Sequence, residues 1–189
     1  MLILYAIIFS SYMIQYRCNP KRLTKIKGGD IMRKKIFISK KAQKHASKGD
    51  FIYPKKHLPK KVLTMKSGGH GQENIHFLNR KRIPNDVDTE FSNGVRLGHI
   101  DGHRDKRNAR KNAHAWFPKE WDRNEIRKAG EHVASLKRNR VLIDGQKHTG
   151  RYRGVTVGII ARKGIVKTIF PFFDVNKHAR SKAHIVYKK

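Results

Sequence analysis

The chain has 189 residues, and its 44 Lys and Arg against 14 Asp and Glu give a formal net charge of +30. This length suits one domain with an apolar core and tails, and it excludes a large multidomain protein. A positive excess of this size favours a large anionic partner, namely a nucleic acid or an acidic membrane surface. Cys18 is the only cysteine, which excludes an internal disulfide and a cysteine-based zinc site.

Residues 1–16 form an apolar run that a basic stretch follows, and three interpretations of this leader (1–31) stay open. The first interpretation is a membrane anchor, because the run is only slightly short for a span and has a basic flank. The second is a secretory signal, although the leader lacks a positive start and a small-residue cleavage site. Or translation begins at Met32, because Lys27-Gly28-Gly29-Asp30 back-translates to AAAGGAGGTGAT, a ribosome-binding sequence.

Residues 32–64 are rich in Lys and contain few apolar side chains, and Pro54 and Pro59 interrupt their second half. This composition predicts a basic lead-in with one short helix at about residues 39–47. The compact domain is expected to cover 65–175, with a basic tail over 176–189.

The middle of the chain alternates turns with short elements. Consecutive glycines predict a turn at 67–71, and a short helix over 72–80 follows, with Ile75 and Leu78 at helical spacing. Residues 83–91 are ambiguous between helix and strand. Asn93-Gly94 is typical of a hairpin turn and leads into a short strand over 95–98.

The second half predicts one long helix and two strands. Asp122 is a good N-cap, Glu125 completes a capping-box pattern, and apolar residues at 126, 129, 133 and 136 mark one face of a helix over 123–137. Residues 152–160 and 165–173 read as strands joined by a turn at Lys163-Gly164. Helices that precede an antiparallel sheet predict an α+β fold.

Histidine can cut RNA without a metal ion, because one ring can take the proton of the 2′-hydroxyl while another protonates the leaving oxygen. His70 lies between glycines in the turn before a helix, where a phosphate can approach the backbone closely. His99 and His103 are further candidates, four residues apart in a segment with Gly98 and Gly102. The alternative at each position is an exposed loop histidine without a chemical role.

The four-residue spacing of His99 and His103 also suits a metal site on a helix. However, Gly98 and Gly102 argue for a loop, and no cysteine or carboxylate cluster completes a zinc shell. We therefore expect neither a metal ion nor another cofactor. A run of cations after His103 is predicted to hold phosphates, unless it is only a solvated charged surface. The run comprises Arg104, Lys106, Arg107, Arg110 and Lys111.

Lys167 and Thr168 are neighbours on the predicted last strand. Their side chains should point to opposite faces unless the strand bulges, so only one of them should reach a site on a given face. Trp116, Phe117 and Trp121 precede the capped helix; aromatic residues in such a cluster stack on bases or, more commonly, pack in a core.

Six motifs, taken in order from about residue 65 to residue 174, resemble the bacterial EndoU nuclease family. They look most like the branch that occurs as C-terminal toxin domains in polymorphic toxins and prophages of Gram-positive bacteria. The motifs are MKSGGHGQEN (65–74), NGVRLG (93–98), HRDK (103–106), WFPKEW (116–121) with KAGE (128–131), GVTVG (154–158) and KTIFP (167–171).

The resemblance implies N-terminal helices packed on a curved antiparallel sheet, and an RNA endonuclease that leaves a 2′,3′-cyclic phosphate. His70 and His103 match the two active-site histidines of the family, and Thr168 matches its hydroxyl residue on the late strand. His99 is a rival to His103, and Lys167 is a rival to Thr168. Phe170 stands where many members have a tyrosine. The resemblance also implies an immunity protein, which we expect to be acidic because complementary charge speeds capture.

Two other functions compete with this interpretation. A metal-dependent His-Asn-His nuclease would use His99, Asn108 and His114, with Asp101 and Asp105 as the nearby acids. A basic RNA- or DNA-binding protein without catalysis would need only the charge. A membrane partner is expected only if residues 1–16 are an anchor.

Overall fold

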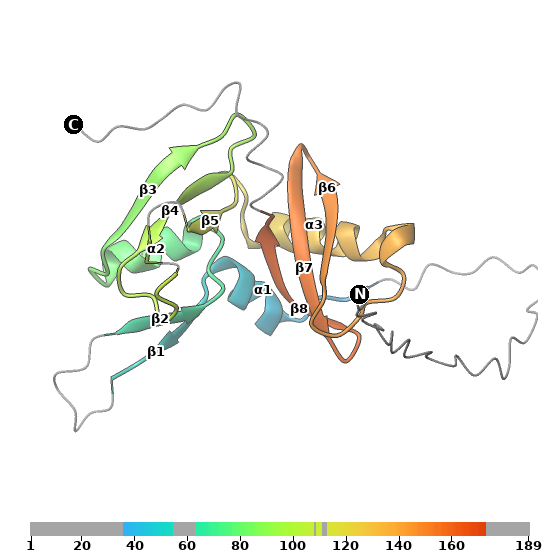
Figure 1. Cartoon of the computed structure of the whole chain (residues 1–189), viewed down its shortest axis with the longest axis horizontal. Helices are drawn as coiled ribbons and strands as arrows, with labels where there is room; N and C mark the ends of the chain where they lie inside the picture. Colours follow the sequence, from blue (N-terminus) through green and yellow to red (C-terminus); the bar gives the residue numbers. More distant parts are fainter. Residues whose placement is uncertain (1–35, 55–62, 108, 111–112, 173–189) are drawn as a thin grey trace, which may run out of the picture. The chain divides into compact units, whose positions relative to one another are not determined.

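The computed structural model describes residues 36–54, 63–107, 109–110 and 113–172 (Figure 1). All of them belong to one compact unit, Arg33–Lys189. The predicted leader (1–31) and basic tail (176–189) lie outside the described residues. None of the helices in the described part of the chain is long and apolar enough to cross a membrane.

Short helices and strands alternate along the described residues, as Figure 1 shows. In chain order they are α1 (Lys40–Ser47), β1 (Asp50–Ile52), β2 (Thr64–Ser67), α2 (Gln72–Arg80), β3 (Asn85–Glu90), β4 (Arg96–Ile100), β5 (His114–Trp116), α3 (Arg123–Ser135), the 3-10 helix η1 (Lys137–Asn139), β6 (Lys147–Tyr152), β7 (Val155–Arg162) and β8 (Ile165–Pro171).

The fold is α+β, as the sequence predicts, but the sheet is divided. The described strands form three small antiparallel sheets, with orders β1-β2, β3-β4-β5 and β6-β7-β8, in place of one curved sheet. The strand order follows the chain in each sheet, and short turns join β6 to β7 and β7 to β8. α3 lies against β6, β7 and β8 and covers one face of that sheet.

The compact domain begins earlier than residue 65. Ser39 caps α1 by accepting a hydrogen bond from the Ala42 N–H (3.2 Å), and Ala42 and Ala46 are buried on the inner face of the helix. Ile38 is fully buried beside them in the main core. The prediction of a lead-in over 32–64 is therefore wrong for this part: two alanines among lysines make an apolar face too small to stand out in the composition.

α3 begins at the predicted cap and is slightly shorter than expected. The Asp122 carboxylate accepts a hydrogen bond from the Glu125 N–H (2.7 Å), which satisfies a backbone donor of the first turn. The Glu125 carboxylate does not complete a capping box. It accepts hydrogen bonds from the Tyr152 hydroxyl (3.1 Å) and pairs with Arg153 (2.8 Å), which ties α3 to the β6–β7 turn.

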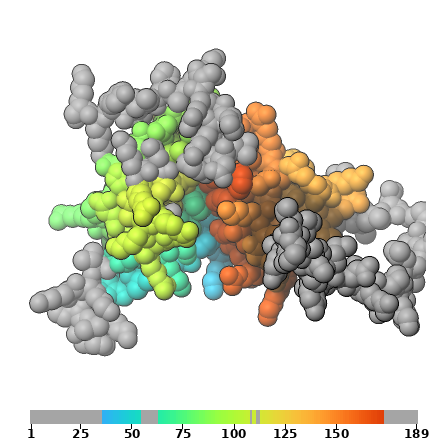
Figure 2. Space-filling view, in the orientation of Figure 1, coloured from blue at the N-terminus to red at the C-terminus, as the bar shows by residue number. Residues whose placement is uncertain are grey.

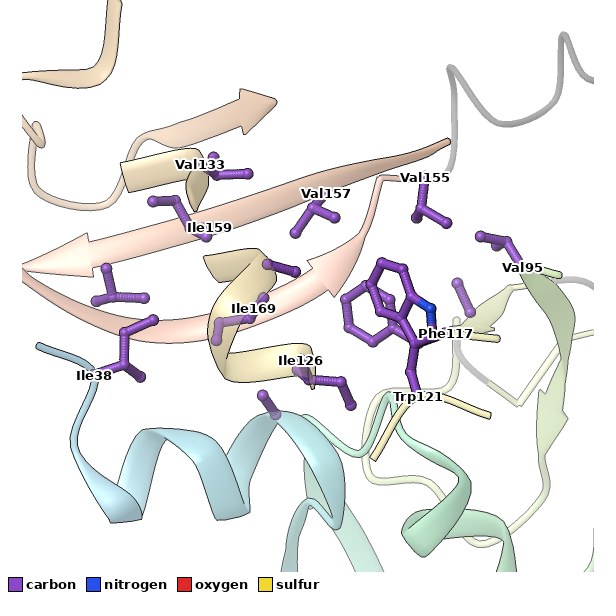
Figure 3. Packing of buried hydrophobic residues seen from close by; sticks show 14 of the residues in the cluster. Ile38, Val95, Phe117, Trp121, Ile126, Val133, Val155, Val157, Ile159 and Ile169 are labelled. Atoms are coloured by element: carbon purple, nitrogen blue, oxygen red, sulfur yellow. The ribbon is translucent and has the colours of Figure 1, made fainter. Parts of the chain in front are cut away.

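The main core joins α1 and α3 to the inner face of sheet β6-β7-β8 (Figure 3). The rings of Phe117 and Trp121 stack at 5.2 Å within it. Trp116 is fully buried in a second cluster with Met65, Leu78 and Ile100. The aromatic cluster before α3 is thus core, and neither tryptophan is exposed for stacking on bases.

Candidate active site

Two glycines shape the turn that carries His70. Gly68 and Gly69 have φ of 75° and 74°, a backbone conformation that other residues adopt at a cost, and a Cβ at Gly69 would collide with the side chains of Met65 and Asn74. The N–H groups of Gly69 and His70 donate to the carbonyls of His45 (2.9 Å) and Ala46 (2.6 Å) at the end of α1. The turn therefore satisfies carbonyls that the helix leaves without partners.

β5 holds both the backbone and the ring of His70. The Phe117 N–H donates to the His70 carbonyl (2.7 Å), and Nδ1 of His70 donates to the Ala115 carbonyl (2.8 Å). Nε2 of His114 donates to the Gly69 carbonyl (3.0 Å), and the His114 ring stacks on the His70 ring with centroids 5.0 Å apart and planes 8° apart. His114 and Ala115 of β5, together with Phe117 just after it, thus fix where His70 points.

His103 lies in the loop after β4, and β2 holds this loop. The Arg104 N–H donates to the Met65 carbonyl (2.7 Å), and the Met65 N–H donates to the Gly102 carbonyl (2.9 Å). The His103 side chain is 3% exposed, and its ring centroid lies 6.0 Å from that of His114. His114, itself 2% exposed, thus lies within ring-contact distance of both His70 and His103.

Hydrogen bonds set opposite protonation patterns on the two predicted catalytic rings. A carbonyl oxygen can only accept, so Nδ1 of His70 carries a proton and Nε2 of the neutral ring has the lone pair. Nδ1 of His103 accepts a hydrogen bond from the Asp105 N–H (2.9 Å), so the proton of the neutral His103 ring is on Nε2. One ring therefore offers an acceptor at Nε2 and the other offers a donor.

Burial keeps both rings neutral near pH 7. The pKa of His70 is lowered to about 4, mainly by desolvation and also by the neighbouring His45 and His103, against the bond to Ala115, which raises it. Desolvation also lowers the pKa of His103, although the nearby Asp105 opposes this effect. The pKa of His114 is lowered well below its usual value, mainly by burial.

His99 lies on the other face of sheet β3-β4-β5. Gly98 is directly opposite His114 in the pairing of β4 with β5, so the side chain of His99, one residue on, points away from the His114 side. Its Nδ1 is 3.1 Å from Asp88, and its Nε2 is 3.7 Å from Asp101. The geometry thus brings His103, and not His99, to the cluster with His70.

β8 places Phe170 beside this cluster and Thr168 on the same face of the sheet. The Phe170 ring centroid lies 6.1 Å from that of His70, and Thr168 is two residues away on the same face, about 7 Å along the strand. The register of β7 and β8 shifts between Ile160 and Ala161, with Lys167 as the extra residue.

This β-bulge is the exception to alternation that the sequence left open, and it puts Lys167 and Thr168 on the same face. Val166 and Ile169 are both buried on the inner face although they are three residues apart, so both residues between them lie on the outer face. Strict alternation fails because the extra residue of a bulge interrupts the period of two.

Comparison with known proteins assigns the family. A model of the family described as bacterial EndoU nuclease matches residues 39–173. The chain belongs to the bacterial EndoU nuclease family. Neither the curated proteins nor the solved structures that were compared give a significant match. The EndoU match begins one residue before α1, which agrees with a domain that starts well before residue 65.

The predicted phosphate-binding loop of this EndoU domain is exposed. Arg104, Lys106, Arg107 and Arg110 all have exposed side chains or intermediate burial, and the yellow-green segment that contains them lies on the visible face in Figure 2. Arg107 pairs with Asp105 (2.8 Å) and lowers the pKa of that carboxyl to about 2. Lys111 lies outside the described residues.

The residues proposed for a His-Asn-His nuclease do not come together. His99 and His114 are on opposite faces of one sheet, and Asn108 lies outside the described residues. Among the residues that the structure describes, no group of three or more His, Cys, Asp and Glu side chains is placed to hold a metal ion.

Sequence reasoning did not assign His114 to the cluster with His70. His114, Ala115 and Trp116 are all buried, so this strand shows no alternation of buried and exposed residues. A strand of only three residues is too short to be recognised by its period.

Proposed function

We propose that this EndoU domain is an endoribonuclease that cuts RNA by attack of a 2′-hydroxyl on the adjacent phosphate. The products would be a 2′,3′-cyclic phosphate and a 5′-hydroxyl. The observation that carries this proposal is the pair of histidine rings beside His114, of which His70 offers a lone pair at Nε2 and His103 an N–H at Nε2.

His70 acts as the general base in this mechanism. Its depressed pKa of about 4 keeps the ring neutral at pH 7, so nearly every molecule can accept the 2′-hydroxyl proton. The hydrogen bond from Nδ1 to the Ala115 carbonyl stabilises the imidazolium that forms, because an N–H donor that becomes charged makes a stronger bond.

His103 donates to the phosphate from Nε2 and protonates the leaving oxygen. To act as an acid it must hold a second proton on Nδ1, which displaces the Asp105 N–H bond. Two nearby charges favour that proton: the Asp105 carboxylate raises the pKa of His103, and a bound phosphate adds a second negative charge.

The Thr168 hydroxyl stabilises charge on the phosphorane as a hydrogen-bond donor. The bulge turns Lys167 to the same face, so its ammonium group is a rival for the same task. Arg104, Lys106 and Arg110 hold the flanking phosphates, with Lys111 as a further expected contact.

We further propose that the domain is a toxin with an acidic immunity protein as its partner. The support is the net charge of +30 together with a nuclease family membership, since such an activity harms the cell that makes it. An acidic protein would be captured fast by this surface, and salt would slow the capture.

The experiment compares cleavage of RNA in EDTA by the full chain and three histidine variants. His70→Ala and His103→Ala should each lower kcat by about 100-fold or more, since general acid–base catalysis contributes about 10²–10⁴. His99→Ala is the matched control and should retain activity. Loss of wild-type cleavage in EDTA would favour the metal-dependent alternative, and activity lost in His99→Ala alone would contradict the assignment of His103.

A further inference from the structure

Strand alternation gives sheet β6-β7-β8 two unlike faces. The inner face is buried and apolar, with Val157, Ile159 and Ile169 in the main core. Apart from Ile160, the outer face carries polar, basic and aromatic side chains that are exposed or of intermediate burial. The register aligns these residues in three neighbouring rows: Lys147, Thr149 and Arg151 on β6, Thr156 on β7, and Phe170 and Phe172 along and just after β8.

Two aromatic rings extend from the histidine cluster along this face. The Phe170 centroid lies 6.1 Å from that of His70 and 6.3 Å from that of Phe172. The Phe170 ring lies against Gly158, where an added Cβ would be 2.6 Å from two of its atoms. Glycine at this position therefore lets the ring lie close against the sheet.

Cations accompany the rings. The Lys147 ammonium nitrogen lies 5.9 Å from the Phe172 centroid, and Arg151 is exposed four residues further along β6. Lys167 adds a third exposed cation, because the bulge turns it to the outer face. Aromatic rings on a surface offer faces on which bases stack, and cations beside them can pair with the phosphates of a single strand.

We propose that the outer face of sheet β6-β7-β8 binds single-stranded nucleic acid, so that RNA runs from the histidine cluster across Phe170 and Phe172 toward Lys147 and Arg151. The inference rests on the proposed function for the chemistry of the cut, and it adds a binding surface for nucleotides beyond the scissile phosphate. Continuity with His70 through Phe170 and the positive charge of the face argue for this occupant. A duplex would not fit, because its bases are paired and cannot stack on the two rings.

The test measures binding of a fluorescent all-deoxy single strand of about 12 nucleotides to the full chain by anisotropy, over a range of salt concentrations. This probe lacks the 2′-hydroxyl, so binding is measured on the unaltered active site without cleavage. Phe172→Ala should weaken binding on the order of 10-fold and leave the salt dependence unchanged, because stacking carries no charge. Phe172→Leu, which keeps the apolar bulk, should weaken binding to a similar extent.

Arg151→Ala should instead change the salt dependence, because each phosphate contact to a single strand contributes about 0.7 to the slope of log K against log salt. Lys137→Ala is the matched control: it removes one exposed charge from η1, and both the affinity and the slope should stay as in the wild type. Circular dichroism checks that each variant folds.

Three results would overturn the proposed binding surface. The first is wild-type affinity for the strand in both Phe172 variants and in Arg151→Ala. The others are a loss of affinity in Lys137→Ala equal to that in Arg151→Ala, and binding of a blunt duplex as tight as that of the single strand. Poly-glutamate, an acidic polymer without bases, tests whether the face binds an acidic protein. If poly-glutamate displaces the strand, and Phe172→Ala changes neither this competition nor strand binding, the face is assigned to an acidic protein and the proposal is overturned. If the deoxy strand binds as expected while RNA is not cut, the proposed function fails and the surface stands.

Discussion

His70 and His103 acquire opposite roles from two backbone groups that no motif records. The Ala115 carbonyl takes the Nδ1 proton of His70, whereas the Asp105 N–H occupies Nδ1 of His103. Both partners are main-chain atoms, so they depend on how β5 and the loop after β4 fold and not on which side chains they carry. A sequence can therefore nominate the two histidines, but it cannot assign base and acid.

His114 supports His70, and its substitution should act through that ring. His114→Phe keeps the stacked ring but leaves the buried Gly69 carbonyl without its donor, which costs about 1–3 kcal/mol and loosens the turn. We expect kcat to fall about 10-fold or more, because small displacements of catalytic groups slow the reaction strongly. RNA binding should change little.

His114→Gln is the matched variant for this prediction, since its amide nitrogen can reach the same carbonyl. It should recover part of kcat and part of the lost stability. Steady-state kinetics and thermal unfolding of both variants provide the measurement. Full activity in His114→Phe would show that the third histidine only fills space.

The helices could be predicted because each has a local signal. Asp122 and the apolar face at 126, 129 and 133 specify α3, and the predicted helices at 39–47 and 72–80 correspond to α1 and α2. The turn at Lys163-Gly164 was also correct and joins β7 to β8. These elements are determined by neighbours in sequence, so their residues are sufficient to recognise them.

The strands were harder because their patterns are short or interrupted. β1, β2 and β5 have three or four residues each, which is too few for alternation to be distinguished from chance. β6 (KHTGRY) reads as polar, since its inward positions are His148 and Gly150. The bulge at Lys167 depends on pairing with β7 and has no signature in the strand itself.

Trp116 and Asp122, in the short segment before α3, should contribute very differently to stability. Trp116 is fully buried, and its indole N–H donates to the Asn74 amide oxygen (3.0 Å), so Trp116→Ala should cost about 3–5 kcal/mol. That is a large part of the total stability of a domain, about 5–15 kcal/mol. Asp122→Ala removes only a helix cap and should cost about 1 kcal/mol.

Urea unfolding of the two variants and the wild type measures this difference. The expected order of midpoints is wild type, then Asp122→Ala, then Trp116→Ala, with the last variant partly unfolded in buffer. A Trp116→Ala midpoint close to that of the wild type would contradict the assignment of the tryptophan to the core.

The stability of the whole domain should depend on pH through its buried histidines. The pKa of His70 is lowered to about 4, and those of His103 and His114 are also lowered, so the unfolded chain binds these protons more readily than the folded one. Their contribution is fully present above the ordinary histidine pKa of about 6.5 and is lost progressively as the pH falls below it.

The melting temperature should therefore fall between about pH 7.5 and about pH 5, before carboxylates are protonated. Glutamine at position 114 does not titrate, so His114→Gln lacks one of the three buried rings and its melting temperature should fall less over the same interval. A melting temperature that rises toward pH 5 would contradict the buried, neutral state of the three rings.

The proposed mechanism depends on a 2′-hydroxyl of the substrate as the nucleophile. The most direct measurement uses an RNA strand in EDTA, a matched strand with a single 2′-deoxy substitution at the mapped cleavage position, and analysis of the product ends by mass spectrometry. We predict 2′,3′-cyclic phosphate ends from the first strand and no cleavage at the substituted position of the second. Cleavage of the 2′-deoxy strand at a comparable rate would contradict the mechanism, because no attacking hydroxyl is then present.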